Sequence, residues 1–437
     1  MRAHRHAAGV GAAAAAILLL AGCATSGGGT TTPEEGGEEE SNAGPITLRF
    51  QSLAFQEPTV EASQAIVDEW NEANPDVQVE YVQGSWDSVH DQLVTQFQGG
   101  SAPDIIHDES ADIAGFATQG YLADLSPYLS DEVMSGVSEG VLESVTVDGQ
   151  IIAAPTLLQS YMVFANTDLL EAAGVEIPTG DSWTWDDFSA AAQATTSGGV
   201  SGVGWGLKSP TATVMSLGLN FDGTFFSGEG DDVTIEVGDN ELEVPQRIHD
   251  MAYVDGSIDP TSLTQSGGDV LPGFLAGDYA MTVQGSYAAQ SLTEQAPDGF
   301  NWAVMPPLEG TSAAQSANPQ TLSVPAESEH IEEAAAFINF FMEADNLAAV
   351  AQGDWLIPTS TEARDAVASA TGGEGGWDQT LLSGDVLTIA PFQKVEAYPQ
   401  WKDQIATPAL QQYFADQIDL EGLRTQLTDG WASVGGA

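Results

Sequence analysis

The chain has 437 residues, of which 64 are Asp or Glu and only 9 are Lys or Arg, so its formal net charge at pH 7 is -55. Such an acidic chain repels phosphate backbones, which excludes nucleic acid as a partner. So few cations also argue against a ligand with several anionic groups, and they favour a neutral or cationic one.

Residues 1–22 have the pattern of a secretory signal peptide. Arg2 and Arg5 precede an apolar run at 12–20, and a Leu-Ala-Gly tripeptide directly precedes Cys23, the only cysteine. The run is shorter than the roughly 20 apolar residues of a lasting transmembrane helix. The Leu-Ala-Gly-Cys sequence resembles a bacterial lipobox, which implies that 1–22 is removed and that Cys23 becomes a lipidated N-terminus; the alternative is an incidental thiol. With this sulfur used, the fold has no disulfide and no cysteine metal site.

Residues 23–44 are predicted to be a lipidated cysteine followed by a disordered tether. From Ala24 to Gly44 no aliphatic residue is larger than alanine, so this segment cannot bury enough apolar surface to offset the entropy of ordering. We expect it to hold a folded body outside the cell, anchored by lipid to the outer face of the cell membrane. The remaining chain, 45–437, is long enough to favour two or more domains over one core.

The first elements after the tether alternate between strand and helix. ITLRFQS at 46–52 and VQVEYVQ at 77–83 alternate apolar and polar residues as strands do. A helical pattern at 58–73 lies between them, and a second helix carries Val89, Leu93 and Phe97 before a short strand at 105–106. This β-α-β-α-β order indicates an α/β layer with a mostly parallel sheet.

The rest of the chain continues the mixture of helices and strands without a repeat of fixed period. Further helices are expected at 110–119, from 167, and at 184–195, 244–255, 269–276, 330–343, 359–370 and 400–416. Further strands are expected at 150–153, 161–165, 279–283, 302–305 and 321–324. Two α/β lobes describe this order most economically.

The order of these segments resembles one family, the extracellular solute-binding proteins of bacterial ABC importers, in their carbohydrate-binding group related to maltose-binding protein. The resemblance is carried by motifs spread over nearly the whole chain after the tether: WNEANPDVQVEYV (70–82), GGSAPDIIHDES (99–110), GYLADLSPYL (120–129), DGQIIAAPTLLQSYMVFANTDLLEAAG (148–174), SWTWDDFSAAA (182–192), FLAGDYAMTVQGSYA (274–288), WAVMPPLEG (302–310) and EEAAAFINFFM (332–342). No single motif is decisive, whereas their number and order are.

The resemblance implies a two-lobed α/β fold of the type II periplasmic-binding-protein kind, with the ligand cleft between lobes joined by a hinge. It implies a first lobe from 45–155 and 305–344 and a second from 156–304 and 345–437. The mechanism implied is hinge closure on the ligand followed by delivery to ABC importer permease subunits. A monomer without enzymatic activity, cofactor or bound metal is expected.

A carbohydrate offers apolar C–H faces and a rim of hydroxyls, so its site needs aromatic rings and polar side chains. Motif positions place four aromatic residues at strand or loop ends, and we expect them to stack on sugar rings: Trp86, Tyr161, Tyr287 and Trp355. Gly285, at the end of the AMTVQG strand, lets a backbone approach a ligand closely. The alternative for each aromatic residue is ordinary core packing.

Polar candidates follow the strands of the first lobe, because ligands of α/β sheets bind beyond the carboxyl ends of parallel strands. They are Gln56, Glu57, Asp87 and Asp108, together with Gln159 in the first crossing segment and Asn318 on the return to the first lobe. Gln159 stands roughly where the maltose-binding relative has a sugar-binding acid. The alternative for the charged members is a solvated face.

The expected ligand is a small neutral carbohydrate, and two other functions stay open. The same fold could bind a peptide, polyamine or other small cation, because carboxylates and aromatic rings suit positive charge. A glycoside hydrolase also uses acids and tryptophans, but no pair of carboxylates is singled out and no G-x-S-x-G, H-E-x-x-H or phosphate-loop motif is present. The histidines show no metal spacing. The sequence leaves the sugar, its chain length and an import or sensing role open.

Overall fold

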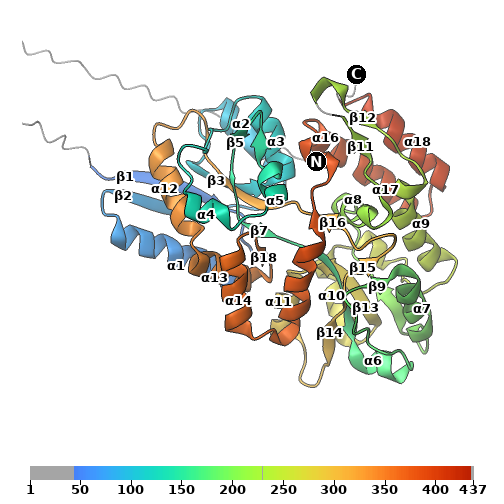
Figure 1. Cartoon of the computed structure of the whole chain (residues 1–437). Helices are drawn as coiled ribbons and strands as arrows, with labels where there is room; N and C mark the ends of the chain where they lie inside the picture. The colour runs from blue at the N-terminus through green and yellow to red at the C-terminus, as the bar shows by residue number, and fades with distance from the viewer. Residues whose placement is uncertain (1–43, 229, 435–437) are drawn as a thin grey trace, which may run out of the picture. The chain divides into compact units, whose positions relative to one another are not determined.

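Two mixed β-sheets built from different stretches of chain organise the fold (Figure 1). The structure is a computed structural model that describes residues 44–228 and 230–434, of which 45–434 belong to one compact unit. The predictions for the signal peptide, Cys23 and the tether lie outside the described residues. No helix in the described ranges is both long and apolar enough to cross a membrane.

The first sheet has five strands in the order β2-β1-β3-β17-β6. β1 (Ile46–Ser52) lies between β2 (Val77–Gln83) and β3 (Ile105–Glu109) and runs parallel to both. β17 (Gln320–Ser323) returns antiparallel to β3, and β6 (Ala154–Pro155) closes the edge antiparallel to β17. The predicted β-α-β-α-β start is confirmed. We call this sheet and the helices packed on it the first lobe.

Helix α1 (Glu57–Ala73) shows why the first lobe forms. Pro58 occupies its first turn, where the missing N–H costs nothing, and Ile66, Val67 and Trp70 are buried on one face. That face meets α12 (Ile331–Phe341) and α13 (Ala344–Asp354), and two phenylalanine rings of α12 pack against Phe50 of β1.

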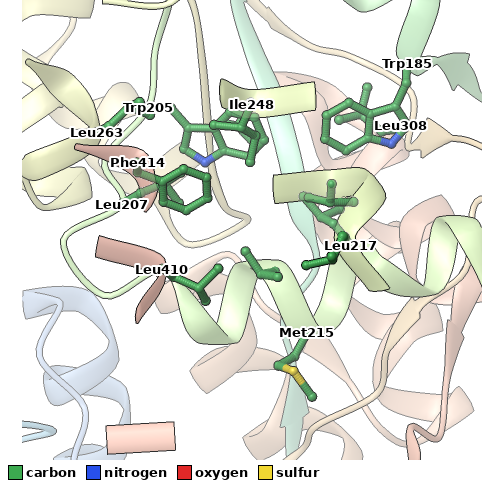
Figure 2. Packing of buried hydrophobic residues seen from close by; sticks show 14 of the residues in the cluster. Trp185, Trp205, Leu207, Met215, Leu217, Ile248, Leu263, Leu308, Leu410 and Phe414 are labelled. Atoms are coloured by element: carbon green, nitrogen blue, oxygen red, sulfur yellow. The ribbon is translucent and has the colours of Figure 1, made fainter. Parts of the chain in front are cut away.

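The second sheet has four strands in the order β10-β13-β8-β14. β13 (Tyr279–Gly285) is parallel to β10 (Ser201–Gly204) and antiparallel to β8 (Tyr161–Asn166), which also pairs with β14 (Trp302–Val304). Its core is rich in aromatic residues, and Figure 2 shows Trp205, Ile248, Leu207 and Phe414 gathered within it. We call this sheet and its helices the second lobe.

The remaining helices flank the two sheets (Figure 1). Their bounds are α2 Val89–Gln98, α3 Ser110–Thr118, α4 Asp131–Ser135, α5 Glu139–Ser144, α6 Thr167–Ala172, α7 Trp185–Thr195, α8 Thr211–Gly218, α9 Asp239–Tyr253, α10 Gly267–Ala276, α11 Ala288–Gln295, α14 Thr361–Thr371, α15 Trp377–Ser383, α16 Tyr398–Trp401, α17 Thr407–Phe414 and α18 Leu420–Trp431. Short two-stranded pairs complete the topology: β4 Thr146–Val147 with β5 Gln150–Ile151, β9 Trp183–Thr184 with β15 Leu308–Glu309, β11 Phe226–Ser227 with β12 Thr234–Ile235, and β16 Gln315–Ser316 with β19 Leu387–Thr388.

Several predicted helices differ from those observed. The helix expected at 400–416 is instead α16, a π-helical stretch at Lys402–Ala406, and α17. The helix expected from 244 begins instead at Asp239. Its start was missed because the first turn is acidic and carries no apolar periodicity. α8 and α13 were not predicted, since both are buried around most of their circumference and show little polar alternation.

The chain crosses between the lobes in short extended segments. β6 leads through β7 (Leu157–Leu158) into β8, and β18 (Ile357–Pro358) pairs antiparallel with β7. The division at 344/345 stays a prediction, but α13 packs against α1, and α14 packs against α13. Both contacts favour assigning 345–371 to the first lobe.

Candidate functional site

A cavity of about 290 Å³ lies between elements of the two lobes. The first lobe contributes residues from the loops after β1 and β2, from the end of β3, and from β17 and the segment before it. The second lobe contributes Tyr287, which follows β13. The lining residues are Phe55, Trp86, Glu109, Gln159, Tyr287, Asn318, Gln320, Asp354 and Leu356. The carboxyl ends of the parallel strands β1, β2 and β3 face it, as ligand sites of α/β sheets require.

Three aromatic rings and the side chain of Leu356 form the apolar part of the wall. The ring of Phe55 is 60% exposed and meets the ring of Tyr287 edge to face, with 6.2 Å between centroids. Trp86 is partly buried and packs edge-on against His107 at 5.5 Å. Because these rings come from the loops after β1 and β2 and from the end of β13, a flat apolar ligand face can contact both lobes.

Gly285 places the Tyr287 ring. A Cβ at residue 285 would lie 2.3 Å from Cε1 of Tyr287, closer than side-chain carbons approach one another. We expected this glycine to let the backbone approach a ligand, whereas the neighbouring space holds the Tyr287 ring. Gly285 therefore acts on the cavity through the position of Tyr287.

Substituting Gly285 by Ala is expected to displace the Tyr287 ring and weaken ligand binding by about tenfold, equivalent to about 1.4 kcal/mol. Gly285 has no positive φ, so the added methyl group acts through its contact with the ring and not through backbone strain. Titration calorimetry of the variant measures the loss. The double variant Gly285→Ala, Tyr287→Ala is the control: if the ring is the cause, the methyl group has little further effect once the ring is gone.

The amide of Gln320 is oriented by a buried histidine. The backbone N–H of Leu53 donates to Nδ1 of His107 over 3.0 Å, so the ring proton lies on Nε2, which donates to Oε1 of Gln320 over 3.1 Å. The Gln320 amide nitrogen is thereby left as a donor at the cavity. Burial lowers the pKa of His107 to about 4, against the weaker opposing effect of the Gln320 hydrogen bond, and keeps the ring neutral at pH 7.

The depressed pKa of His107 predicts a stability loss in acid. His107 binds a proton with its ordinary pKa of 6.5 in the unfolded chain but only near pH 4 in the folded chain. The contribution of its neutral ring to the free energy of unfolding is therefore full above pH 6.5 and is lost as the pH falls towards 4. The stability advantage of the wild type over His107→Gln, measured by urea unfolding, should shrink by about 3 kcal/mol between pH 7 and pH 4. A difference that is independent of pH would contradict a neutral buried ring.

Glu109 belongs to a charged cluster behind the cavity. Lys402 Nζ of the second lobe lies 3.0 Å from Asp112 Oδ1 and 3.9 Å from Glu109 Oε1 of the first. Burial and the charge of Asp112 raise the pKa of Glu109 to about 7, against the opposing effects of Lys402 and an Asn318 hydrogen bond. Burial alone would lower the pKa of Lys402, but Asp112 and Glu109 raise it well above its ordinary value. Lys402 therefore stays protonated at pH 7, and its ion pairs link the two lobes.

Asn318 is fixed by the start of α3. Its Oδ1 accepts hydrogen bonds from the Ser110 hydroxyl at 2.9 Å and from the backbone N–H of Ala111 at 3.1 Å. Its amide nitrogen is therefore the donor, and Glu109 receives its hydrogen bond. Together with Gln159 and Gln320, it gives the cavity three amide side chains beside two carboxylic acids.

Asp354 closes another part of the wall. It is the last residue of α13, its exposed fraction is 3%, and Oδ1 has no hydrogen-bond partner among the described residues. Burial raises its pKa to about 6, although the Thr59 hydroxyl acts in the opposite direction.

Of the residues predicted from the sequence, Trp86, Gln159, Tyr287 and Asn318 line the cavity. Gln56 lies next to it, 8% exposed, and its Nε2 donates to the backbone oxygen of Tyr287 over 2.9 Å, a contact between the lobes.

Five predicted residues lie elsewhere. Glu57 and Asp87 are exposed, at the first turn of α1 and in the loop before α2. Asp108 is a fully buried residue of β3, and its Oδ1 accepts a hydrogen bond from the backbone N–H of Glu109. The Trp355 indole stacks on Trp377 at 4.5 Å and donates to Gln290, so its ring is part of the core. Tyr161 packs against the second core, with burial raising its pKa.

Five lining residues were not predicted from the sequence: Phe55, Glu109, Gln320, Asp354 and Leu356. Phe55 and Glu109 are sequence neighbours of the candidates Gln56 and Asp108, and the period-two alternation of a strand could have pointed to Glu109. Gln320 and Asp354 carried no signal, because nothing in the sequence shows that β17 and the end of α13 meet the loops after β1 and β2.

This arrangement defines a class of protein. Two α/β lobes with separate sheets, extended crossings between them and a cavity lined by both make up the type II periplasmic-binding-protein fold, as the resemblance predicted. The family model for bacterial extracellular solute-binding proteins matches residues 56–348, and the chain belongs to this family.

Three similar proteins agree with this assignment. A Streptomyces antibioticus protein described as an uncharacterized lipoprotein in the oleD 5'region is 44% identical over 385 residues, which cover 87% of this chain and 85% of the relative. The fold matches that of the GacH receptor of Streptomyces glaucescens, solved unliganded and with acarbose, with a TM-score of 0.75 at 22% identity over 89% of this chain and 98% of the receptor. Maltose-bound MalE3 of T. maritima matches with a TM-score of 0.74 at 19% identity, over 89% and 99% of the two chains.

Proposed function

We propose that the protein captures a sugar or oligosaccharide outside the cell and delivers it to an ABC importer. The observation that carries this proposal is the composition of the cavity wall: three aromatic rings, three amides and two carboxylic acids around about 290 Å³. Rings suit the C–H faces of a sugar, and amides and carboxylates suit its hydroxyls. We assign binding to the nine lining residues and a linking role to Gln56.

Proteins of similar fold support a carbohydrate ligand. The GacH receptor was solved in complex with acarbose and MalE3 with maltose, so proteins of this fold bind saccharides. Cavity volume supports a short ligand, since about 290 Å³ lies at the lower end of the range for small-molecule sites.

We propose that the ligand closes a hinge at the crossing segments. Two contacts already join the lobes: Gln56 with the Tyr287 backbone, and Lys402 with Asp112. A ligand that touches both lobes favours the closed state by its additional contacts there. Small-angle scattering should show a smaller radius of gyration at saturating ligand, and an unchanged radius would count against hinge closure.

Membrane anchoring through Cys23 is part of the proposal. It is supported by the Leu-Ala-Gly-Cys sequence and by a 44% identical relative that is described as a lipoprotein. The protein would act as a monomer at the outer face of the membrane and meet permease subunits there. Mass spectrometry of the N-terminal peptide tests the acylation.

A thermal-shift screen tests the proposed function. A ligand at 100 times its dissociation constant stabilises the folded state by about 2.7 kcal/mol, so a panel of mono- and oligosaccharides should contain at least one compound that raises the unfolding temperature. A panel of peptides serves as the comparison. If peptides stabilise the protein and no saccharide does, the proposal fails.

The alternative of a glycoside hydrolase has one structural argument. Glu109 and Asp354 both line the cavity and both have raised pKa values, as general acids do. However, the family consists of solute-binding proteins. Incubation with oligosaccharides and chromatography of the products decides between them: we expect no released sugar, and release that depends on Glu109 or Asp354 would establish the hydrolase.

A further inference from the structure

The charged groups that line the cavity are all acidic. Glu109 and Asp354 belong to the wall, and no lysine or arginine does. Lys402 forms an ion pair with Glu109, but it is closer to Asp112 than to Glu109. The cavity therefore presents negative charge that residues of its own wall do not balance.

The other cations of residues 44–434 have partners elsewhere or are exposed, and none of them lines the cavity. Arg247 pairs with Asp186 and Glu243, Arg424 pairs with Asp239 and Glu421, and Lys394 pairs with Glu143. The guanidinium of Arg364 donates to the backbone oxygen of Pro358, and Arg49 and Lys208 are exposed. In the described part of the chain, none of these cations forms an ion pair with Asp354.

Asp354 is the acid that most requires an explanation. Its carboxyl group is withdrawn from water and borders the cavity, and among the described residues the Thr59 hydroxyl is the hydrogen-bond donor that acts on it. One hydroxyl does not satisfy a buried carboxylate, and in native structures the remaining capacity of such a group is normally met by a ligand, an ion or water. Asp354 also sits on a rigid element, the last turn of α13, which is packed against α1.

A hydroxyl group and an ammonium group of a ligand would satisfy this carboxylate differently. A hydroxyl donates one hydrogen bond and leaves the negative charge of the buried carboxylate uncompensated. An ammonium group donates a charge-assisted hydrogen bond and compensates the charge as well. The rings of Phe55, Trp86 and Tyr287 add to this preference, because aromatic faces attract cations.

We propose that the ligand is an amino sugar, or an oligosaccharide that contains one, whose protonated amine pairs with Asp354 while the three amide side chains bind its hydroxyls. This inference rests on the proposed function and narrows its substrate class. It also joins the two ligand chemistries left open by the sequence, since one molecule offers both the sugar faces and the positive charge.

Calorimetric titration with matched saccharides tests the inference. Glucosamine, galactosamine and chitosan oligosaccharides are compared with glucose, galactose and cello-oligosaccharides of equal length, at pH 7. The titrations contain 0.15 M salt, because a chain of net charge -55 attracts any cation and salt screens that general effect over about 8 Å. We expect at least one amino saccharide to bind ten times more tightly than its neutral counterpart.

Two variants locate the preference. Asp354→Asn keeps the shape and removes the charge, and it should bring the ratio of the affinities for the amino saccharide and its neutral counterpart from about tenfold to within about twofold, whatever it does to the neutral affinity. Asp345→Asn makes the same charge change at the exposed first turn of the same helix and should keep the preference. A retained preference in Asp354→Asn, or its loss in Asp345→Asn, would overturn the assignment to Asp354.

The outcomes separate this inference from the proposed function. If amino and neutral saccharides bind with equal affinity, the assignment of an amino sugar is overturned while the proposal of carbohydrate binding stands. Binding of simple amines as tightly as amino saccharides also overturns it, because the sugar ring then contributes nothing. If no saccharide of either kind binds, the proposed function fails and the inference fails with it.

Discussion

Tyr287→Ala is expected to lower the affinity for carbohydrate by about 30- to 100-fold, equivalent to about 2–3 kcal/mol. The Tyr287 ring is the second-lobe contribution to the cavity wall, and it also supports the exposed ring of Phe55 from the first lobe. Gln56 donates its hydrogen bond to the backbone oxygen of Tyr287 and not to its side chain, so this link between the lobes survives the substitution. The loss therefore reports on the ring alone.

Two variants serve as controls for Tyr287→Ala in the same calorimetric titration. Tyr287→Phe keeps the ring and should retain affinity to within about fivefold, a loss of about 1 kcal/mol from one hydrogen bond. Tyr128→Ala removes a tyrosine side chain that is 40% exposed and is not part of the cavity wall, and it should have no effect. Unchanged binding by Tyr287→Ala would mean that the sugar does not contact this ring.

Lys402→Met is expected to lower the free energy of unfolding by about 2–3 kcal/mol. The methionine fills the space of the lysine stem but leaves Asp112, whose side chain is 8% exposed, without its cation next to Glu109. Removing one partner of a buried ion pair costs more than the pair contributes, because the remaining charge stays desolvated. Lys402 is itself 19% exposed, which places the expected loss below that of a fully buried pair.

Lys208→Met is the matched control for charge, because Lys208 is exposed and its loss makes the chain equally more acidic. Adding Asp112→Asn to Lys402→Met should recover more than half of the lost stability, since the uncompensated carboxylate is then removed. Chemical unfolding of the four proteins measures these terms. A loss in Lys402→Met no greater than that in Lys208→Met would show that the cluster contributes only general charge.

Much of the fold could be predicted because its signals are local. The alternation of β1 and β2 and the apolar stripe of α1 follow from their own residues, and the structure confirms them. β10 was missed because SGVG is short and contains two glycines, so neither alternation nor β-branched residues mark it. The π-helical stretch that begins at Lys402 was not predicted, since that geometry depends on how α16 and α17 pack.

The candidate site was predictable only in part, because its wall is assembled from distant segments. Trp86 and Tyr287 could be proposed from the motifs around them, and both line the cavity. Trp355 was proposed by the same reasoning, yet its indole stacks on Trp377 at 4.5 Å, a contact that brings together residues on either side of α14. Whether an aromatic ring faces a ligand or a core depends on such tertiary partners, which spacing along the chain does not encode.

The crystal structure of the protein with the saccharide that binds best in calorimetry tests the central claim most directly. We predict the ligand between Trp86 and Tyr287, with its polar groups at Asn318, Gln320 and Asp354. A ligand bound instead in the surface hollow of about 280 Å³ beside Arg247 and Trp185, with the cavity between the lobes empty, would contradict the assignment.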